Sequence, residues 1–237
     1  MATAAELDRA AWIRDGYLVV RDVLPAAELV GLREAAEAVC AAASQTDGSV
    51  QLDPTSALLC APELAPSVCR LAELAADPKL LGAAEFLLGA EGHTALYQLL
   101  LVRSPPVPLP PPPPPGGNMG TDPRHWHRDH RPDRSGPLSL LQADLAANGP
   151  AHCQWNLALY PDSVFEVVPG SHFRQATAEE ATALRSDGGT AHPLPGSTAV
   201  SLGAGDTAAL CVTQAPHASQ FCTGASGFTE HSTHHRG

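Results

Sequence analysis

The sequence predicts a mainly β domain, a sandwich or barrel, that carries helices on one flank. Residues 1–92 show the apolar spacing of helices, whereas short alternating stretches separated by turn residues dominate from residue 124 onward. The chain has 237 residues, of which 44% are hydrophobic. This length suits one large domain with a substantial core.

The expected elements of the helical flank follow from glycine, proline and apolar spacing. Gly16 ends a first helix, because glycine readily adopts the left-handed backbone of a helix C-terminus. Pro25 and Pro78 each begin a helix, since proline fits the first helical turn. In chain order we expect a helix over 5–14, a strand over 17–20, a helix from 25 to about 43, a loop over 44–53, and helices over about 66–76 and 77–88.

Strands dominate the rest of the expected structure. Residues 152–160 alternate, which places Cys153 and Trp155 on one face. Thr177 and Glu180 match a capping box that begins a short helix to about residue 184. The other expected strands lie at 94–102, 165–168, 198–202 and 207–212, and the last two are joined by a Gly-Ala-Gly-Asp hinge.

A run of prolines separates the two halves. Residues 105–115 are almost entirely proline, which excludes a helix or a central strand and predicts polyproline II. The preferred interpretation is a stiff surface insertion, a loop over 103–123. The alternative is a docking motif for a partner domain of the SH3 or WW type, which binds proline-rich segments in an aromatic groove.

Charge and cysteine usage exclude several function classes. The net charge is −11 and Lys79 is the one lysine, so we expect neither a nucleic-acid surface nor an anionic-membrane surface. No run approaches the ~20 apolar residues of a membrane span, and the N-terminus lacks the features of a signal peptide. The six cysteines are scattered without metal-site spacing. A cytoplasmic, reducing location is expected.

The candidate chemistry centres on His127 and Asp129. Side chains two residues apart on an extended strand point to the same face, so this pair offers a nitrogen and an oxygen ligand together. His217 follows the last of the expected strands after a short loop. Together the three residues make a 2-His-1-carboxylate iron(II) set that leaves open positions on the metal. His125 and His127 could instead suggest zinc, but no further zinc ligand has suitable spacing.

Other polar and aromatic residues near these positions have simpler explanations. Gln154 and Asn156 either face a pocket or satisfy backbone groups at a strand edge. His172 is expected to hydrogen-bond the backbone in a turn rather than to bind metal. Trp126 and Trp155 are expected in the core or in a pocket wall, and the cysteines Cys211 and Cys222 are expected to serve packing.

Four stretches in order resemble the phytanoyl-CoA dioxygenase family of Fe(II)- and 2-oxoglutarate-dependent oxygenases. They are Asp15–Leu24, Trp126–Asp129, Val167–His172 and Gly205-Asp206, within a similarity over about residues 9–220. The resemblance implies a double-stranded β-helix (a cupin-like jelly roll) preceded by helices. It also implies hydroxylation of a small organic substrate with O2, coupled to decarboxylation of 2-oxoglutarate to succinate and CO2.

The resemblance assigns roles residue by residue. His127, Asp129 and His217 would be the iron ligands and the catalytic residues. Ser219, two residues after the distal histidine, matches a position that helps to hold 2-oxoglutarate. Arg103 lies where the family often has a basic residue before Pro-Pro that reaches the cosubstrate.

One departure from the family pattern concerns the cosubstrate arginine. The family places an Arg about ten to fourteen residues after the distal histidine, whereas residues 227–231 contain none and Arg236 is the next one. Arg103 or Arg236 would have to replace it. The alternative function is therefore a catalytically impaired jelly-roll binding protein that keeps the metal site.

The expected domain organisation is a single oxygenase domain over residues 1–237. It comprises the helical flank 1–92, the proline-rich loop 103–123, a β-rich metal-binding part 124–220 and an irregular tail 221–237 that ends before the last strand is complete.

Overall fold

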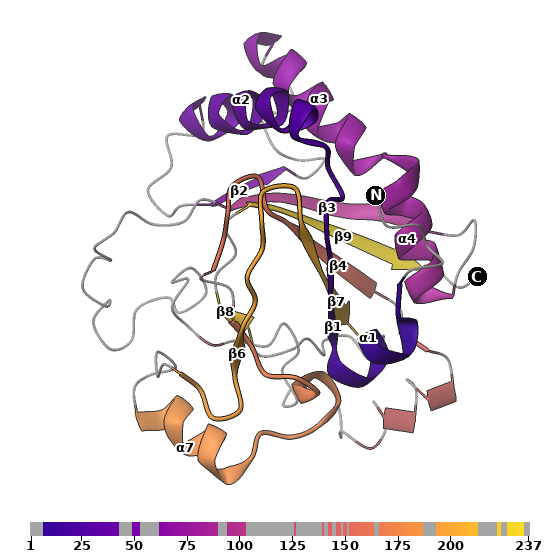
Figure 1. Ribbon diagram of the computed structural model, residues 1–237, viewed down its shortest axis with the longest axis vertical. Coiled ribbons are helices and arrows are strands. Elements are labelled where there is room, and N and C mark those ends of the chain that lie inside the picture. The colour runs from indigo at the N-terminus through magenta and orange to yellow at the C-terminus, as the bar shows by residue number, and fades with distance from the viewer. Residues whose placement is uncertain are drawn as a thin grey trace.

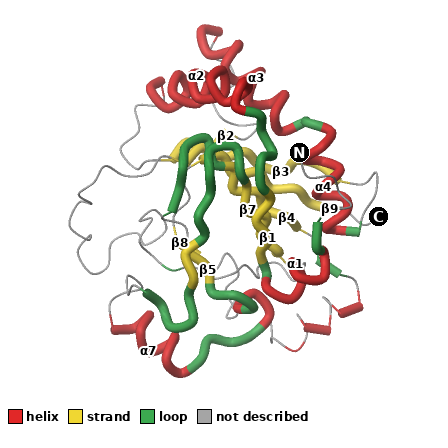
Figure 2. Tube along the Cα trace, viewed as in Figure 1, coloured by secondary structure: helices red, strands yellow, loops and turns green. Residues whose placement is uncertain are grey.

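A computed structural model describes two antiparallel sheets flanked by helices (Figure 1, Figure 2). The described residues are 7–42, 49–52, 62–89, 94–102, 126, 139, 142–143, 146–147, 149–150, 152–163, 166–186, 193–212, 222–223 and 227–234. Among them no helix is long and apolar enough to cross a membrane.

The chain begins with a short helix that leads directly into the large sheet. Helix α1 (Arg9–Asp15) starts at Asp8, whose carboxylate accepts a hydrogen bond from the Ala11 amide at 2.8 Å. It ends at Gly16, which has φ +83° and donates its N–H to the Trp12 carbonyl. Strand β1 (Tyr17–Val20) follows at once, so the turn at Gly16 sets the direction in which the chain enters the sheet.

Three further helices cover one face of the large sheet. They are α2 (Ala26–Ala42), α3 (Ala65–Ala75), which follows the 3-10 turn η3 (Pro62–Leu64), and α4 (Pro78–Leu88). Asp77 begins α4 by accepting a hydrogen bond from the Lys79 amide, and Gly89 ends it with φ +68°. Figure 1 shows α2 and α3 lying across this face of the sheet, with α4 at its side.

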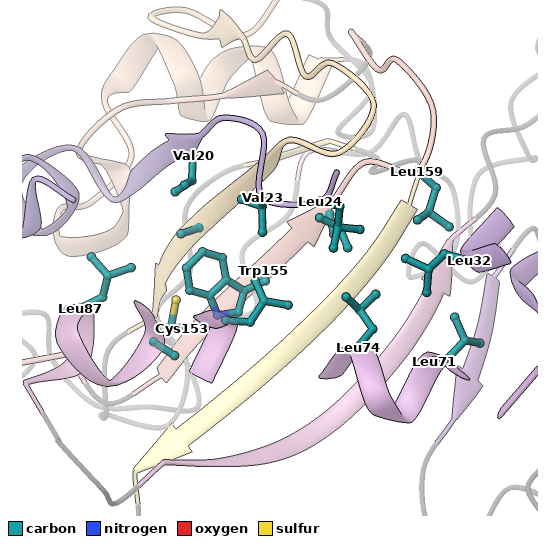
Figure 3. Close-up of a cluster of buried hydrophobic side chains, with 14 of the residues drawn as sticks. Val20, Val23, Leu24, Leu32, Leu71, Leu74, Leu87, Cys153, Trp155 and Leu159 are labelled. Carbon is teal, nitrogen blue, oxygen red and sulfur yellow. The ribbon is translucent and has the colours of Figure 1, made fainter. Parts of the chain in front are cut away.

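The larger part of the core lies between these helices and the sheet; we call it the helix-side core. Trp155 stands at its centre, surrounded by leucines of the helices (Figure 3). Cys153 and Leu157 lie on the same face of their strand as Trp155. The buried members from α2, α3 and α4 are Leu29, Leu32, Ala35, Val39, Leu71, Leu74, Leu80, Ala84, Leu87 and Leu88. Burial of each leucine or valine in this set contributes about 1.5–3 kcal/mol before entropy is subtracted.

The large sheet has six strands in the order β1-β7-β4-β9-β3-β2. The members not yet given are β2 (Ser49–Leu52), β3 (Thr94–Val102), β4 (His152–Leu157), β7 (Thr207–Val212) and β9 (Gly227–His234). Strand β4 therefore lies inside the sheet, with β7 on one side and β9 on the other. Its backbone groups pair on both edges.

The second sheet is small and has the order β6-β5-β8. Its strands are β5 (Glu166–Val167), β6 (Thr198–Ala199) and β8 (Cys222–Thr223). An inter-sheet cluster joins it to the large sheet. The buried members of that cluster are Ala158, Val167, Val200, Leu202, Ala208 and Leu210, with Tyr17 and Val19 packed against them.

Helix α7 (Ala178–Ser186) follows the 3-10 turn η4 (Ser171–Phe173) and lies beside the small sheet (Figure 1). The predicted capping box is confirmed: the Thr177 hydroxyl accepts the Glu180 amide at 3.1 Å, and Glu180 accepts the Thr177 amide at 2.7 Å. Glu180 also forms two hydrogen bonds with Arg174, at 2.6 and 2.8 Å. Because only 2% of Glu180 is exposed, these contacts are needed to offset the burial of its charge.

Several expectations about the fold are wrong. The predicted loop 44–53 includes β2, which pairs with β3. The predicted irregular tail 221–237 includes β8 and β9. The part 124–220 contains the strands β4 to β7, and its described residues 139, 142–143 and 146–147 are helical. Polar strands such as β9 are missed because their stability comes from pairing with neighbours, not from apolar periodicity. The proline run 105–115 lies outside the described residues.

Candidate metal and cosubstrate site

The six residues assigned to the metal and the cosubstrate lie outside the described residues. They are His127, Asp129, His217, Ser219, Arg103 and Arg236. Their positions remain predictions. The structure does describe residues that flank them in the chain, and these show which elements hold the ends of the candidate segments.

Trp126, directly before His127, is anchored beside the small sheet, next to the end of β5 and to α7. It is 5% exposed and packs with Val168 and Leu194. Residues Ala183 and Leu184 of α7 pack against the same group, together with Ala176, and we call the whole set the α7 cluster. The prediction that Trp126 is a core or wall residue is confirmed. A buried indole here fixes the backbone where the His-x-Asp motif begins.

The segment 213–221, which carries His217 and Ser219, is held at both ends by strands of different sheets. Val212 ends β7 and pairs with His152 of β4. Cys222 begins β8 and pairs with Val167 of β5. The chain therefore leaves the large sheet before His217 and enters the small sheet after it. Val167 is adjacent to Val168, which contacts Trp126, so the anchors of both candidate segments meet at β5.

The start of β7 is held by Asp206. Its carboxylate accepts hydrogen bonds from the Asp22 amide at 2.9 Å, from Arg21 at 2.6 Å and from the Gly203 amide at 2.7 Å. Burial acts to raise the pKa of this carboxyl, but these hydrogen bonds and the Arg21 charge outweigh it and hold the pKa below its usual value. Gly205 is required beside it: its φ is +92°, and a Cβ there would lie 2.6 Å from the Leu24 carbonyl oxygen.

His172 joins the Pro-Gly-Ser-His turn to helix α1. The ring is 2% exposed, and its Nε2 lies 2.9 Å from the Ile13 carbonyl oxygen. The expected hydrogen bond to backbone is confirmed, although the partner belongs to a distant helix rather than to the turn itself. No three His, Cys, Asp or Glu side chains of the described segments form a group that could hold a metal.

The buried cysteines behave as packing residues. Cys153 and Cys211 are fully buried on the helix side of the large sheet. Burial raises the pKa of the Cys211 thiol far above its usual value, so it stays protonated. A thiol cannot replace a thiolate as a metal ligand or nucleophile, which confirms the packing role predicted for Cys211.

Gln154 and Asn156 do not lie on an edge strand, because β4 pairs on both sides. Gln154 donates from Nε2 to Asn156 Oδ1 at 3.2 Å. The register places Gln154 opposite Leu210 and Asn156 opposite Ala208, both members of the inter-sheet cluster. Cross-strand partners share a face, so the two amides face the small sheet. The structure therefore disfavours the alternative in which the two amides satisfy backbone groups at a strand edge, and favours the one in which they face the interior.

Sequence reasoning missed how the motifs outside the metal ligands contact one another. Gly16 and His172 touch, and so do Asp206 and Asp22, although each pair is separated by more than 150 residues. The resemblance marks all four residues within its motifs. The signal was thus present, but spacing along the chain does not reveal which motifs meet.

Comparison with known proteins places the fold. No protein-family model matches the chain, and no curated protein matches its sequence. Solved structures do match over nearly its whole length. HygX from Streptomyces hygroscopicus, solved with nickel and 2-oxoglutarate bound, has a TM-score of 0.61 at 16% identity, and the match covers 96% of this chain and 87% of HygX.

Two other solved structures that match this chain are also linked to 2-oxoglutarate, which is the same compound as α-ketoglutarate. EctD from S. alaskensis, solved with 2-oxoglutarate and 5-hydroxyectoine, has a TM-score of 0.55 at 19% identity, covering 95% of this chain and 74% of EctD. SnoK, a non-heme α-ketoglutarate-dependent carbocyclase of nogalamycin biosynthesis, has a TM-score of 0.56 at 19% identity, covering 98% of this chain and 84% of SnoK. The chain therefore shares the fold of HygX, EctD and SnoK.

Proposed function

We propose that this protein is an Fe(II)- and 2-oxoglutarate-dependent oxygenase of the phytanoyl-CoA dioxygenase type that hydroxylates a small organic substrate. The proposal takes residues 1–237 as one double-stranded β-helix domain with a helical flank. The observation that carries it is the match over nearly the whole chain to structures solved with 2-oxoglutarate. The residues of the His-x-Asp…His pattern supply the ligand types that iron(II) requires.

The anchors of the candidate segments support this ligand set. Trp126 packs into the α7 cluster, whereas Val167 packs into the inter-sheet cluster. Consecutive side chains of an extended strand alternate between faces. If the chain stays extended after Trp126, His127 and Asp129 are therefore directed away from α7, toward the space between the sheets. The segment that carries His217 spans the same two sheets.

In this proposal the chain binds and orients the metal, the cosubstrate and the substrate, and it keeps water out of the site. His127, Asp129 and His217 hold the metal, and Ser219 contributes to holding the cosubstrate. Iron with 2-oxoglutarate and O2 would supply the oxidising power for hydroxylation of a C–H bond. The protein would contribute a site from which the two packed sheets keep solvent out.

The arginine that would pair with the far carboxylate of 2-oxoglutarate is the unassigned part of the proposed site. The positions where the family pattern places it fall on β9, Gly227–His234, which contains none. Strand β9 lies between β3 and β4. Arg103 directly follows β3 and Arg236 lies two residues after the end of β9. We propose that one of these two arginines pairs with the far carboxylate of 2-oxoglutarate, a charge-assisted interaction.

The first test separates metal binding from cosubstrate binding. Anaerobic titration of purified protein with Fe(II), then with 2-oxoglutarate, should produce a visible metal-to-ligand charge-transfer absorption. Asp129→Ala should abolish metal binding, whereas the control Asp133→Ala, outside the motif, should not. A wild-type protein that binds no metal refutes the proposal.

The second test assigns the arginine. Arg103→Ala or Arg236→Ala should weaken 2-oxoglutarate binding at least tenfold, the effect of losing about 1.4 kcal/mol. The control is Arg185→Ala, because Arg185 is an exposed residue of α7. If iron binds and 2-oxoglutarate does not, the protein is the catalytically impaired binding protein instead. Docking of an SH3 or WW domain on residues 105–115 and a cytoplasmic location both stay predictions.

A further inference from the structure

Gln154 carries a buried hydrogen-bond acceptor that no group in the described part of the chain satisfies. Its Oε1 has no hydrogen-bond partner and less than 1 Å² of exposed surface. Its Nε2 donates to Asn156 Oδ1, which fixes the orientation of the amide. A buried acceptor without a donor costs about 1–3 kcal/mol, so such a group calls for a specific explanation.

The location of Gln154 distinguishes it from other buried polar atoms. Trp155 Nε1 and Thr207 Oγ1 also lack partners. Trp155 belongs to the helix-side core, and Thr207 pairs with Leu157 on that same face. Gln154 instead faces the space between the two sheets, where its cross-strand neighbour Leu210 belongs to the inter-sheet cluster.

Gln154 also lies near the point where the chain departs toward the proposed metal ligand. Leu210, its partner across the ladder, is two residues from Val212, the end of β7. A strand advances about 3.4 Å per residue, so this end is roughly 7 Å away along the strand. The segment that carries His217 begins there. A ligand held between the sheets next to the metal would therefore be within reach of Gln154.

The chemistry of an acceptor excludes the cosubstrate as its partner. At neutral pH 2-oxoglutarate has two carboxylates and a keto group, so it accepts hydrogen bonds and donates none. Gln154 Oε1 needs a donor. Apart from water, the organic substrate is the one small molecule of the proposed reaction that can provide a donor, through a hydroxyl or an ammonium group.

We propose that Gln154, held by Asn156, is a substrate-recognition residue that accepts a hydrogen bond from a hydroxyl or ammonium group of the substrate. The inference rests on the proposed function, because it assigns the substrate to the space between the sheets. It names the substrate class as a donor-bearing polar molecule rather than a hydrocarbon or a simple carboxylate. A site built to receive such a donor discriminates against analogues without it, since the acceptor is then left buried and unpaired.

The test compares matched probes that differ only in the donor. Cyclohexanol is paired with cyclohexyl methyl ether, and cyclohexylamine with cyclohexyltrimethylammonium. Binding to the Zn(II)- and 2-oxoglutarate-loaded protein is measured by saturation-transfer NMR, a readout independent of turnover. Wild type should prefer at least one donor-bearing probe over its partner by about two- to tenfold, the effect of one neutral hydrogen bond.

Substitutions then assign the preference to Gln154. Gln154→Leu, or Gln154→Met if the leucine variant does not fold, should remove the preference while 2-oxoglutarate affinity stays within twofold. Gln154→Glu should shift it toward the ammonium probe. The control Gln175→Leu, at an exposed position, should leave it unchanged.

The results that overturn the inference are distinct from failure of the proposed function. No preference in wild type, whether it binds both probes or neither, means that Gln154 meets a buried water only. A preference that persists in Gln154→Leu, or a loss of 2-oxoglutarate affinity in that variant, also overturns it. Failure of the proposed function shows earlier, as absence of metal or cosubstrate binding in wild type.

Discussion

Substitution of Gly16 by alanine should destabilise the protein far more than the same change at another helix C-terminus. Gly16 ends α1 with φ +83°, and a Cβ there would lie 2.3 Å from Nδ1 of the buried His172 ring. Gly89 ends α4 with φ +68°, and its Cβ would meet only the end of the Arg9 side chain, at 3.1 Å. The two glycines share a backbone conformation and differ in what surrounds them.

The magnitude follows from adding the separate costs. An alanine in the left-handed region costs about 1–2 kcal/mol at either position. At Gly16 the His172 ring must also move, which loses its hydrogen bond to Ile13, worth about 1 kcal/mol. Repacking an overfilled buried site costs about 1–3 kcal/mol more. Gly16→Ala should therefore cost roughly 3–6 kcal/mol, and Gly89→Ala about 1–2 kcal/mol.

Urea unfolding at a fixed pH measures both values, with the slope of the transition checked for constancy. A thermodynamic cycle with His172→Ala isolates the contact. In the His172→Ala background the ring is absent, so Gly16→Ala should cost only about 1–2 kcal/mol, as at Gly89. The reasoning is refuted if Gly16→Ala and Gly89→Ala agree within about 0.5 kcal/mol in the wild-type background, or if removal of His172 leaves the cost at Gly16 unchanged.

Three further outcomes are expected. The folded-state pKa of Asp206 is depressed, so its stabilisation is fully present above the unfolded pKa near 4 and is lost as pH falls through the folded value. Urea unfolding midpoints are measured from pH 6 to pH 3, and the difference in midpoint between wild type and Asp206→Asn should shrink on acidification. Asp15→Asn should show a smaller effect, because the ion pair of Asp15 is exposed. Glu180→Ala should cost about 2–4 kcal/mol in thermal unfolding by loss of buried charged hydrogen bonds, and the exposed neighbour Glu179→Ala under 0.5 kcal/mol; equal costs would contradict this. Mass mapping after a short iodoacetamide pulse should find Cys211 unmodified in the native protein and modified in urea, because burial keeps its thiol protonated.

Elements whose signals are local were predicted well from the sequence. The bounds of β1 and β7 match the expected 17–20 and 207–212, because both strands are rich in apolar and β-branched residues. Helix α4 begins after Asp77 and ends at Gly89 as capping rules require. In each case the residues that determine the element lie inside it or next to it.

Strands that depend on distant partners were not predicted. Strand β9 reads Gly-Phe-Thr-Glu-His-Ser-Thr-His, which has no apolar alternation. It forms between β3 and β4, both of which have backbone groups that need a neighbour on that side. The information for β9 thus lies in the edges of other strands, and no window of its own sequence contains it.

For the candidate site, residue types could be predicted but surroundings could not. The proposed ligand set follows from the chemistry of histidine and carboxylate, whereas the packing of Trp126 and the pairing of Val212, which flank it in the chain, emerge only from the structure. The buried acceptor of Gln154 is likewise invisible in sequence, since it depends on the register that sets Gln154 opposite Leu210.

The motifs of the resemblance contain two groups of residues. One group comprises the proposed metal ligands, and the other makes contacts that hold the fold. Gly16 meets His172, Asp206 binds Arg21 and the Asp22 amide, and the turn at Gly205 approaches the Leu24 carbonyl. These contacts link the start of β1, the turn before α7 and the start of β7 into one support.

That support lies next to the strand that leads to the proposed distal ligand. Substitutions within it should lower the free energy of unfolding and reduce metal binding only as far as β7 is displaced. Substitutions of His127, Asp129 or His217 should abolish metal binding with little loss of stability, because in the proposed site those side chains serve the metal and not the core. Measuring the free energy of unfolding and the metal affinity of both groups of variants therefore distinguishes the residues that stabilise the fold from the residues proposed to bind the iron.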